Sequence, residues 1–205
     1  MEWFKYEAEL KQKGYNIVCG VDEAGRGPLA GPVFAAAVIL DPQCQIEGLN
    51  DSKKLSEKKR ELLFEEITEK ALDFGIWAVD EKTIDEINIL QATYLAMREA
   101  VKQLDITPDA AIIDGNRMPP EMPCYCESLV KGDALCTSVA AASVLAKVSR
   151  DRFMLMQAQK YPEYNFGKHK GYGTKEHCQA ILQYGPSPIH RMTFLKKLLE
   201  GQKGE

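Results

Sequence analysis

The sequence predicts an α/β fold in which a mixed sheet carries helices on its faces. Three strand-like segments come first along the chain, and helices then alternate with further strands. With 205 residues, of which 45% are hydrophobic, the chain is long enough for one domain with a substantial core and too short for two. No internal repeat, low-complexity tract or linker interrupts it. We therefore expect residues 1–205 to form a single domain.

Five segments have the apolar composition of strands. Residues 16–21 (NIVCGV) predict a buried strand that leads into Asp22 and Glu23, and residues 33–40 (VFAAAVIL) predict a second one. The segment between them, AGRGPLAGP, is expected to be a loop because of its glycines and prolines. The remaining strand candidates are residues 74–79, 110–113 and, more weakly, 125–130.

The first two helices are predicted from their capping residues and apolar spacing. Ser56 caps a charged helix that runs to about Leu72, while Thr83 and Glu86 form the T-x-x-E capping box of a second helix. Pro108 closes this second segment, whose apolar side chains recur every three or four residues and should pack on the sheet. These side chains are Ile84, Ile87, Leu90, Tyr94, Met97, Val101 and Leu104.

Two further helices are predicted in the second half of the chain. One covers Ser138 to about Lys160 with small residues that allow close approach, and a shorter one runs from near Thr174 to Gly185. The segment 192–199 (MTFLKKLL) is amphipathic if it is helical. Such a segment either docks a partner or covers the core, and the sequence leaves both interpretations open.

Composition and charge limit the location and the partners of the protein. The 26 Lys plus Arg against 30 Asp plus Glu give a net charge of −4, which supplies no global attraction for a polyanion. A nucleic-acid surface must therefore be a local basic patch. The longest apolar run, residues 33–40, is too short for a membrane span, and the N-terminal segment lacks the apolar stretch of a secretory signal. We expect a soluble cytoplasmic protein whose six cysteines are reduced.

Four acids stand where predicted strands end or loops begin, namely Asp22, Glu23, Asp114 in IIDGN and Asp133 in VKGDA. In open α/β sheets, ligands bind beyond the carboxyl ends of the strands, so acids from three segments should converge there. Oxygen ligands with no nearby His or Cys suit Mg²⁺ or Mn²⁺, and these ions favour phosphoryl-transfer chemistry. Each acid taken alone is more typical of a turn or a helix cap. Only the constellation indicates a metal site.

Glycines and cations surround these acids. The segment 25–31 lacks the G-K-[ST] ending of a P-loop, but its glycines permit backbone amides to approach a substrate, with Arg26 available for a phosphate. The same residues also suit a simple turn. Basic runs border the acids, and Tyr172 follows one of them, so they are either solvated faces or a nucleic-acid surface. They comprise Lys53, Lys54, Lys58, Lys59, Arg60, Lys147, Arg150, Arg152, Lys168, His169 and Lys170.

Seven motifs, in this order, closely resemble the ribonuclease HII family: VDEAGRGPLAGPV, LNDSKKLSEKKR, IDGN, VKGDA, AAASVLAKVSRDR, HKGYGT and YGPSPIHR. The resemblance spans roughly Val18 to Phe194, with residues 134–137 (ALCT) unmatched and the tail after Phe194 divergent. The related ribonuclease HIII group has an additional N-terminal domain and a different pattern after the first carboxylates. The short N-terminus and the GRG sequence of this chain argue against that group.

The resemblance implies a ribonuclease H-like fold with a central mixed five-stranded sheet flanked by helices. It also implies a helical C-terminal portion, about residues 160–205, that binds substrate. Asp22, Glu23, Asp114 and Asp133 would be the catalytic and metal-binding carboxylates. The implied substrate-binding residues are Gly25, Arg26 and Gly27, which contact the ribonucleotide's 2′-hydroxyl and phosphate, Tyr172, which packs against the sugar, and Ser52, Lys53 and Lys147.

The resemblance further implies an endonuclease that hydrolyses the RNA strand of RNA/DNA hybrids and cuts 5′ of single ribonucleotides in duplex DNA. Two Mg²⁺ or Mn²⁺ ions would bridge the scissile phosphate, one activating a water and the other stabilising the departing 3′-oxygen, to leave 3′-hydroxyl and 5′-phosphate ends. Such an enzyme serves ribonucleotide excision repair and DNA replication. We expect a monomer with at most a weak sliding-clamp contact. The alternatives are a non-catalytic nucleic-acid binding module and a carboxylate nuclease that acts on DNA.

Overall fold

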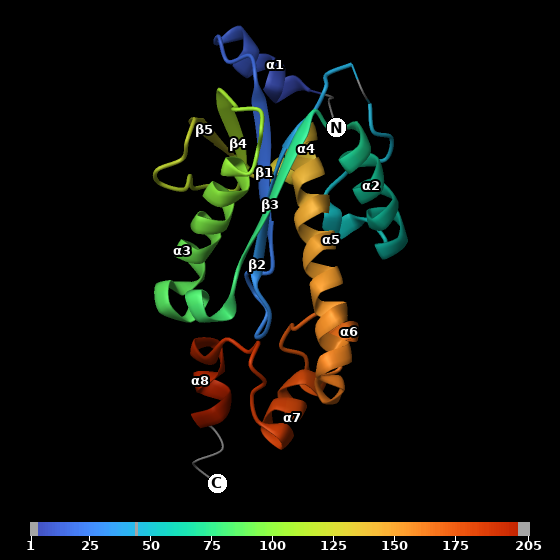
Figure 1. Cartoon of the computed structure of the whole chain (residues 1–205), viewed down its shortest axis with the longest axis vertical. Coiled ribbons are helices and arrows are strands. Elements are labelled where there is room, and N and C mark those ends of the chain that lie inside the picture. Colours follow the sequence, from blue (N-terminus) through green and yellow to red (C-terminus); the bar gives the residue numbers. More distant parts are fainter. Residues whose placement is uncertain (1–3, 44, 201–205) are drawn as a thin grey trace.

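Five strands form the centre of the computed structural model, which describes residues 4–43 and 45–200 (Figure 1). The strands are β1 (Val18–Ala24), β2 (Val33–Ile39), β3 (Asp73–Val79), β4 (Ala110–Asp114) and β5 (Tyr125–Leu129). Their order in the sheet is β3-β2-β1-β4-β5. The β1–β2 and β2–β3 pairs are antiparallel, whereas β1–β4 and β4–β5 are parallel. The sheet is mixed and five-stranded, as predicted.

β1 extends further toward its C-terminal end than the predicted strand of residues 16–21. It continues through Asp22 and Glu23 because β2 pairs with it as far as Ala24. β4 likewise includes Asp114, which pairs with β5. These acids are therefore held within the sheet rather than in the loops after it, so their backbones have well-defined positions.

Eight α-helices and two short 3₁₀ helices surround the sheet in the described chain. Ser56 and Thr174 cap α2 and α7 as predicted, and none of these helices is long and apolar enough to cross a membrane. The sequence did not predict α1, α4 or α6. The α-helices are α1 (Lys5–Gln12), α2 (Glu57–Lys70), α3 (Glu81–Lys102), α4 (Gly132–Leu135), α5 (Thr137–Lys160), α6 (Phe166–His169), α7 (Lys175–Tyr184) and α8 (Met192–Glu200), and the 3₁₀ helices are Ser52–Lys54 and Pro162–Tyr164.

The predicted capping box at the start of α3 is wrong. Asp80, not Thr83, is the N-cap, and its Oδ1 accepts a hydrogen bond from the backbone N–H of Thr83 at 2.8 Å. The helix is then interrupted at Asn88, whose φ of 67° is left-handed. The Asn88 Oδ1 accepts from the N–H of Leu90 and of Gln91, so this side chain starts the longer second part of the helix.

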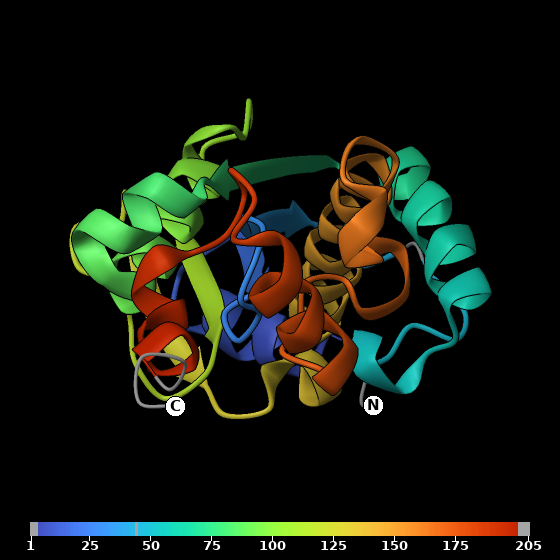
Figure 2. The same cartoon turned by 90° about the horizontal axis from the view of Figure 1, so that it is seen from below.

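The two long helices cover opposite faces of the sheet (Figures 1 and 2). α3 packs on the face that carries Val21 and Ala35, and α5 packs on the face that carries Ala36 and Val38. α5 lies very close to β1, because a Cβ added to Gly20 would be 2.1 Å from the backbone carbon of Ser138. The small residues predicted for this helix therefore serve close helix–sheet packing.

The C-terminal segments α6, α7 and α8 lie at one end of the molecule, with α6 against the end of α5 (Figure 1). They share a small core with Met154 of α5 and Ala30 of the loop after β1, and this core includes the fully buried side chains of Phe166 and Leu195, with Leu198 and Leu199 packed against it. The apolar side of α8 thus covers core, which was one of the two interpretations of the segment 192–199. Residues 201–205 lie outside the described chain.

The described cysteines Cys19, Cys124, Cys126, Cys136 and Cys178 are free thiols, as predicted, and Cys44 lies outside the described residues. Burial raises the pKa of the Cys136 thiol, which keeps it protonated and unreactive. These observations agree with a structural role for that cysteine.

All three histidines of the chain lie together in the C-terminal portion and form a buried hydrogen-bonded cluster. His177 Nδ1 faces the Tyr172 carbonyl, so it carries the proton, and His177 Nε2 then accepts from His190 Nε2 at 2.9 Å. His190 Nδ1 accepts from the Ser187 N–H, and His169 Nδ1 accepts from the Gly171 N–H. Each ring is therefore bonded as the neutral imidazole.

We predict that acidification destabilises the fold through this histidine cluster. Burial lowers the pKa of His177 and of His190 to about 4, below the usual histidine value of about 6.5. Between these pKa values the unfolded chain binds more protons than the folded chain does. The free energy of unfolding therefore falls as the pH drops from about 7 toward about 4. Between about pH 7 and about pH 5, the melting temperature should fall by several degrees.

His177→Asn is the matched control for this prediction, because its amide can still donate to the Tyr172 carbonyl but does not titrate. The variant should be less stable than the wild type at neutral pH and should lose less stability on acidification. Thermal melts across the pH range would measure both slopes. Equal slopes would show that the cluster does not control the acid sensitivity.

Candidate active site

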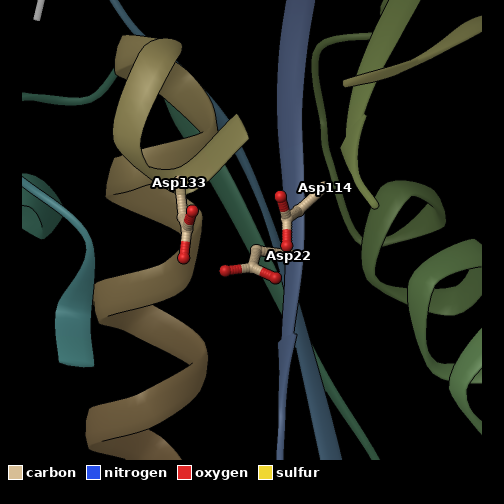
Figure 3. A group of neighbouring side chains, drawn as sticks. All are labelled: Asp22, Asp114 and Asp133. Carbon is tan, nitrogen blue, oxygen red and sulfur yellow. The ribbon is translucent and has the colours of Figure 1, made fainter. Parts of the chain in front are cut away.

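Three aspartate side chains converge at the carboxyl ends of β1 and β4. Asp22 lies in β1, Asp114 ends β4 and Asp133 lies in α4, and one carboxylate oxygen of each is within 4.8 Å of the others. Figure 3 shows these carboxylates directed toward a common space. Because β1 and β4 are parallel neighbours, the acids at their carboxyl ends meet at one edge of the sheet. The structure thus brings together three of the four acids selected from the sequence.

Asp133 joins this group because the chain turns sharply before α4. Lys131 has a left-handed backbone with φ of 61°, and the following Gly132 donates its N–H to Asp114 Oδ1 at 2.7 Å. A Cβ on Gly132 would lie only 3.2 Å from Val139, so glycine permits this approach. One short segment therefore orients Asp114 and carries Asp133.

Glu23, the fourth predicted acid, lies beside the three aspartates but does not belong to the group within 4.8 Å. Its Oε1 accepts a hydrogen bond from Arg26 Nη1 at 3.4 Å. Burial raises the pKa of Glu23, whereas the Arg26 charge acts to lower it. Glu23 is thus available to the site but paired with a cation in this structure.

Asp22 and Asp133 are buried, Asp114 is partly buried, and the three carboxylates repel one another as anions. Asp22 is 4% exposed and Asp133 is 6% exposed. Burial raises the pKa of Asp22 well above its usual range, and the charges of Glu23 and Asp114 raise it further. Lys53 Nζ, 3.5 Å from Asp133 Oδ2, offsets this repulsion only in part. An all-oxygen donor set of this charge fits a divalent cation such as Mg²⁺ or Mn²⁺.

Every predicted substrate-binding residue lines one cavity of about 210 Å³ beside the aspartates. The loop after β1 forms one wall, and Tyr172, which is 47% exposed, faces it, because a Cβ on Gly27 would lie 3.7 Å from the Tyr172 ring. The cavity therefore combines glycine backbone, cations and an aromatic side chain. Its lining residues are Asp22, Glu23, Ala24, Gly25, Arg26, Gly27, Ser52, Lys53, Lys147, Arg150 and Tyr172.

A second cavity, of about 310 Å³, lies on the other side of Glu23 and Arg26, which border both cavities. Asp114, Tyr94 and Arg117 also line it. Arg117 is not among the site residues predicted from the sequence. Its place directly after the IDGN motif was the available signal, because residues that follow β4 emerge at the same edge of the sheet.

The basic runs are less available than the sequence suggests. Lys147 Nζ lies 2.7 Å from Asp151 Oδ1, and Arg152 is paired with Glu61. Arg150, counted among the surface cations, is only 1% exposed, so that interpretation is wrong. Lys53 keeps a side chain that is 75% exposed. The patch next to the aspartates therefore rests mainly on Lys53, Arg26 and the partly buried Lys147.

Comparison with known sequences gives a consistent result. A family model described as Ribonuclease HII matches residues 19–197. The Ribonuclease HII of Caldicellulosiruptor saccharolyticus is 55% identical over 197 residues, which is 96% of this chain and 96% of that protein. The Ribonuclease HII of Marinomonas sp. is 58% identical over 188 residues, 91% of this chain and 94% of that protein.

Solved structures agree with this result. The ribonuclease H2 from Pyrococcus horikoshii superimposes with a TM-score of 0.76 at 30% identity, over 92% of this chain and 100% of that one. The ribonuclease HII in a PCNA complex from Archaeoglobus fulgidus superimposes with a TM-score of 0.70 at 26% identity, over 86% of this chain and 94% of that one. A Bst-RNase HIII in complex with Mn²⁺ superimposes with a TM-score of 0.69 at 19% identity, over 92% of this chain and 71% of that one. At this identity the similarity shows the fold alone.

Proposed function

This chain belongs to the ribonuclease HII family and is therefore an endoribonuclease of the ribonuclease H type, and we propose that it cuts 5′ of ribonucleotides embedded in duplex DNA as well as within the RNA strand of RNA/DNA hybrids. The single observation that carries the proposal is the convergence of Asp22, Asp114 and Asp133 next to a cavity lined by glycine backbone and Tyr172. The acids supply a site for hydrolysis, and the cavity supplies groups that can read a sugar.

We propose that the three aspartates and Glu23 hold Mg²⁺ or Mn²⁺, with two ions in the active enzyme. Bound ions would supply positive charge at the scissile phosphate and a water of lowered pKa. The carboxylates of this chain hold the charge in place, and the Gly132 N–H keeps Asp114 oriented. No nucleophilic side chain is required by this chemistry.

The cavity residues would select the substrate. The backbone amides of Gly25, Arg26 and Gly27 would bind the 2′-hydroxyl and the adjoining phosphate, since groups left unpaired by a missing hydroxyl discriminate strongly between sugars. Tyr172, from the C-terminal portion of about residues 160–205, would pack against the next sugar. Ser52, Lys53 and Lys147 would contact phosphates, which contribute to affinity in a salt-dependent way. This assignment makes the C-terminal portion a substrate-binding extension of a single catalytic domain.

A direct test uses a duplex with one embedded ribonucleotide, incubated with and without Mg²⁺. Because the proposed site needs both a cation and a 2′-hydroxyl, we expect cutting on the 5′ side of the ribonucleotide only when Mg²⁺ is present. Mass spectrometry of the products should find 3′-hydroxyl and 5′-phosphate ends. An all-DNA duplex of the same sequence is the control and should be cut more slowly by roughly 10⁴-fold or more.

The other outcomes identify the alternative functions. Binding of the duplex without any cleavage would indicate a nucleic-acid binding module. Equal cutting of the all-DNA and ribonucleotide-containing duplexes would indicate a carboxylate nuclease that acts on DNA. Either result would contradict the proposed function.

The monomeric state, the cytoplasmic location and a weak sliding-clamp contact stay predictions. The Archaeoglobus fulgidus relative was solved as a complex with PCNA. In this chain, Leu195 on α8 packs into the C-terminal core, so a clamp contact would have to use other side chains.

A further inference from the structure

Arg191 is a fully buried arginine whose guanidinium lies beneath the loop between β1 and β2. It is 0% exposed and donates five hydrogen bonds, all of them to backbone carbonyl oxygens of this loop. The acceptors are the carbonyls of Gly25 at 2.6 Å, Arg26 at 3.0 Å, Pro28 at 2.9 Å, and Gly31 at 2.9 and 2.6 Å. Arg191 thus donates hydrogen bonds to four carbonyls of the loop from one side.

Arg150 supports the same loop from α5. Its Nε donates to the Pro32 carbonyl at 3.2 Å and its Nη2 to the Ala30 carbonyl at 3.1 Å. Burial lowers the pKa of Arg191 to about 9, and the neighbouring Arg150 charge adds to this effect. The Arg191 guanidinium remains protonated at neutral pH, because a pKa of about 9 is still well above it.

The hydrogen bonds give the loop two different sides. The carbonyls of Gly25 and Arg26 point toward the Arg191 guanidinium, whereas no hydrogen bond within the described residues uses the N–H of Gly25, Arg26 or Gly27 as a donor. These three residues line the cavity beside the aspartates. Because these carbonyls accept hydrogen bonds from a buried guanidinium, the amides of the same residues remain available to donate to an electronegative ligand, such as a hydroxyl or phosphate oxygen.

The segment that contains Arg191 also fixes the rest of the loop. The N–H of Arg191 donates to the Leu29 carbonyl at 2.9 Å, and the N–H of Leu29 donates to the Gly171 carbonyl at 2.8 Å. Next to Arg191, His190 donates to His177, whose Nδ1 binds the Tyr172 carbonyl. The loop and Tyr172 are therefore positioned by the same buried network.

We propose that Arg191, assisted by Arg150, is a positioning residue for sugar recognition, which holds the Gly25–Gly27 amides in the orientation that reads the ribonucleotide's 2′-hydroxyl. This inference rests on the proposed function. Arg191 is fully buried below the loop and is not among the residues that line the cavity beside the aspartates. Its effect should therefore appear in the choice between ribose and deoxyribose, not in general affinity for duplexes.

The test compares Arg191→Lys with the wild type on two duplexes that differ only in one sugar, ribose or deoxyribose. Lysine keeps the charge but cannot donate to all four carbonyls as one planar guanidinium does. We expect kcat/KM on the ribonucleotide duplex to fall roughly tenfold or more, since small misplacements of a binding group cost at least that much. The duplex Kd should stay within about twofold because it depends on phosphate contacts.

A purely structural role for Arg191 predicts a different pattern. Partial unfolding lowers the active fraction equally for both substrates, so the ratio of ribose to deoxyribose cleavage would not change. Leu63→Ala, which truncates a fully buried side chain on α2 away from the loop, provides a matched destabilised control with unchanged selectivity. Arg150→Lys provides a second variant, with a smaller loss of selectivity, because Arg150 holds Ala30 and Pro32 rather than Gly25 and Arg26.

The outcomes separate this inference from the proposed function. A wild-type enzyme with no preference for ribose would overturn both. A selective wild type with equally selective Arg191→Lys and Arg150→Lys variants would overturn the positioning role and leave the proposed function intact. If Arg191→Lys does not fold, the selectivity of Arg150→Lys tests the positioning role, because Arg150 bonds the same loop. Selectivity equal to that of the wild type would then overturn that role.

Discussion

Asp22→Asn and Asp114→Asn should each lower kcat on a ribonucleotide-containing duplex by roughly 10³-fold or more, with duplex affinity nearly unchanged. The two side chains offer carboxylate oxygens within 4.8 Å of each other and of Asp133, and an amide supplies a weaker, uncharged ligand at the same place. Single-turnover kinetics with Mg²⁺ and fluorescence anisotropy of the duplex would measure the two effects separately.

The stability of these variants offers an independent check. Burial and the neighbouring carboxylates raise the pKa of Asp22, so removal of its charge relieves repulsion in the metal-free protein. The melting temperature of Asp22→Asn without metal should therefore equal or exceed that of the wild type. Asp105→Asn, an exposed position remote from the three aspartates, is the matched control and should retain full activity. Near-normal cleavage by both active-site variants would remove these acids from the mechanism.

The sequence predicted the parts of the site that depend on strand periodicity. Asp22 and Asp114 follow apolar runs, and parallel neighbouring strands end at one edge, so the amino-acid pattern alone was enough to expect their convergence. Asp133 was expected in the same group because it follows the weaker strand candidate of residues 125–130, but its exact position could not be predicted from the pattern. It depends on the left-handed Lys131 and on the four-residue helix α4, neither of which has a periodic signal.

The sequence was misleading where local patterns compete or where burial is decided by distant segments. Thr83 and Glu86 match a capping box, yet Asp80 stands three residues earlier and caps the helix in their place. Arg150 looked like part of a basic surface run, but it lies under a loop that is more than 100 residues away in sequence, at a separation of 118 from its partner Pro32. Long-range contacts of this kind are not encoded in local composition.

The same contacts explain why the C-terminal portion affects the site at all. Tyr172 is the residue of this portion that lines the cavity. Arg191 and the backbone hydrogen bonds to Leu29 and Gly31 also fix the loop that follows β1. The active-site edge therefore depends on two parts of the chain, the sheet for the acids and the C-terminal portion for the loop. A variant within the loop should consequently disturb substrate selection without removing the aspartates.

Gly25→Ala should produce that disturbance, with a loss in kcat/KM on the ribonucleotide duplex of roughly 10²-fold or more. Gly25 has φ of +98°, and a Cβ there would lie 2.1 Å from Arg150 Nε and 2.9 Å from the Pro32 carbonyl oxygen. Because Arg150 and Pro32 are both buried and are hydrogen-bonded to each other, neither can move freely, so the loop must shift at Gly25. The amides that face the cavity would move with it.

Gly14→Ala is the matched control for the backbone strain in this substitution. Gly14 has a similar φ of +99°, but a Cβ there would meet no atom within 4 Å. Both variants should lose stability, by about 1 kcal/mol for the strained backbone alone, and only Gly25→Ala should lose activity. Paired thermal melts and kinetic assays on the ribonucleotide duplex would separate strain from displacement of the loop. Full activity in Gly25→Ala would mean that the loop can shift without consequence, and its amides would then have no part in reading the sugar.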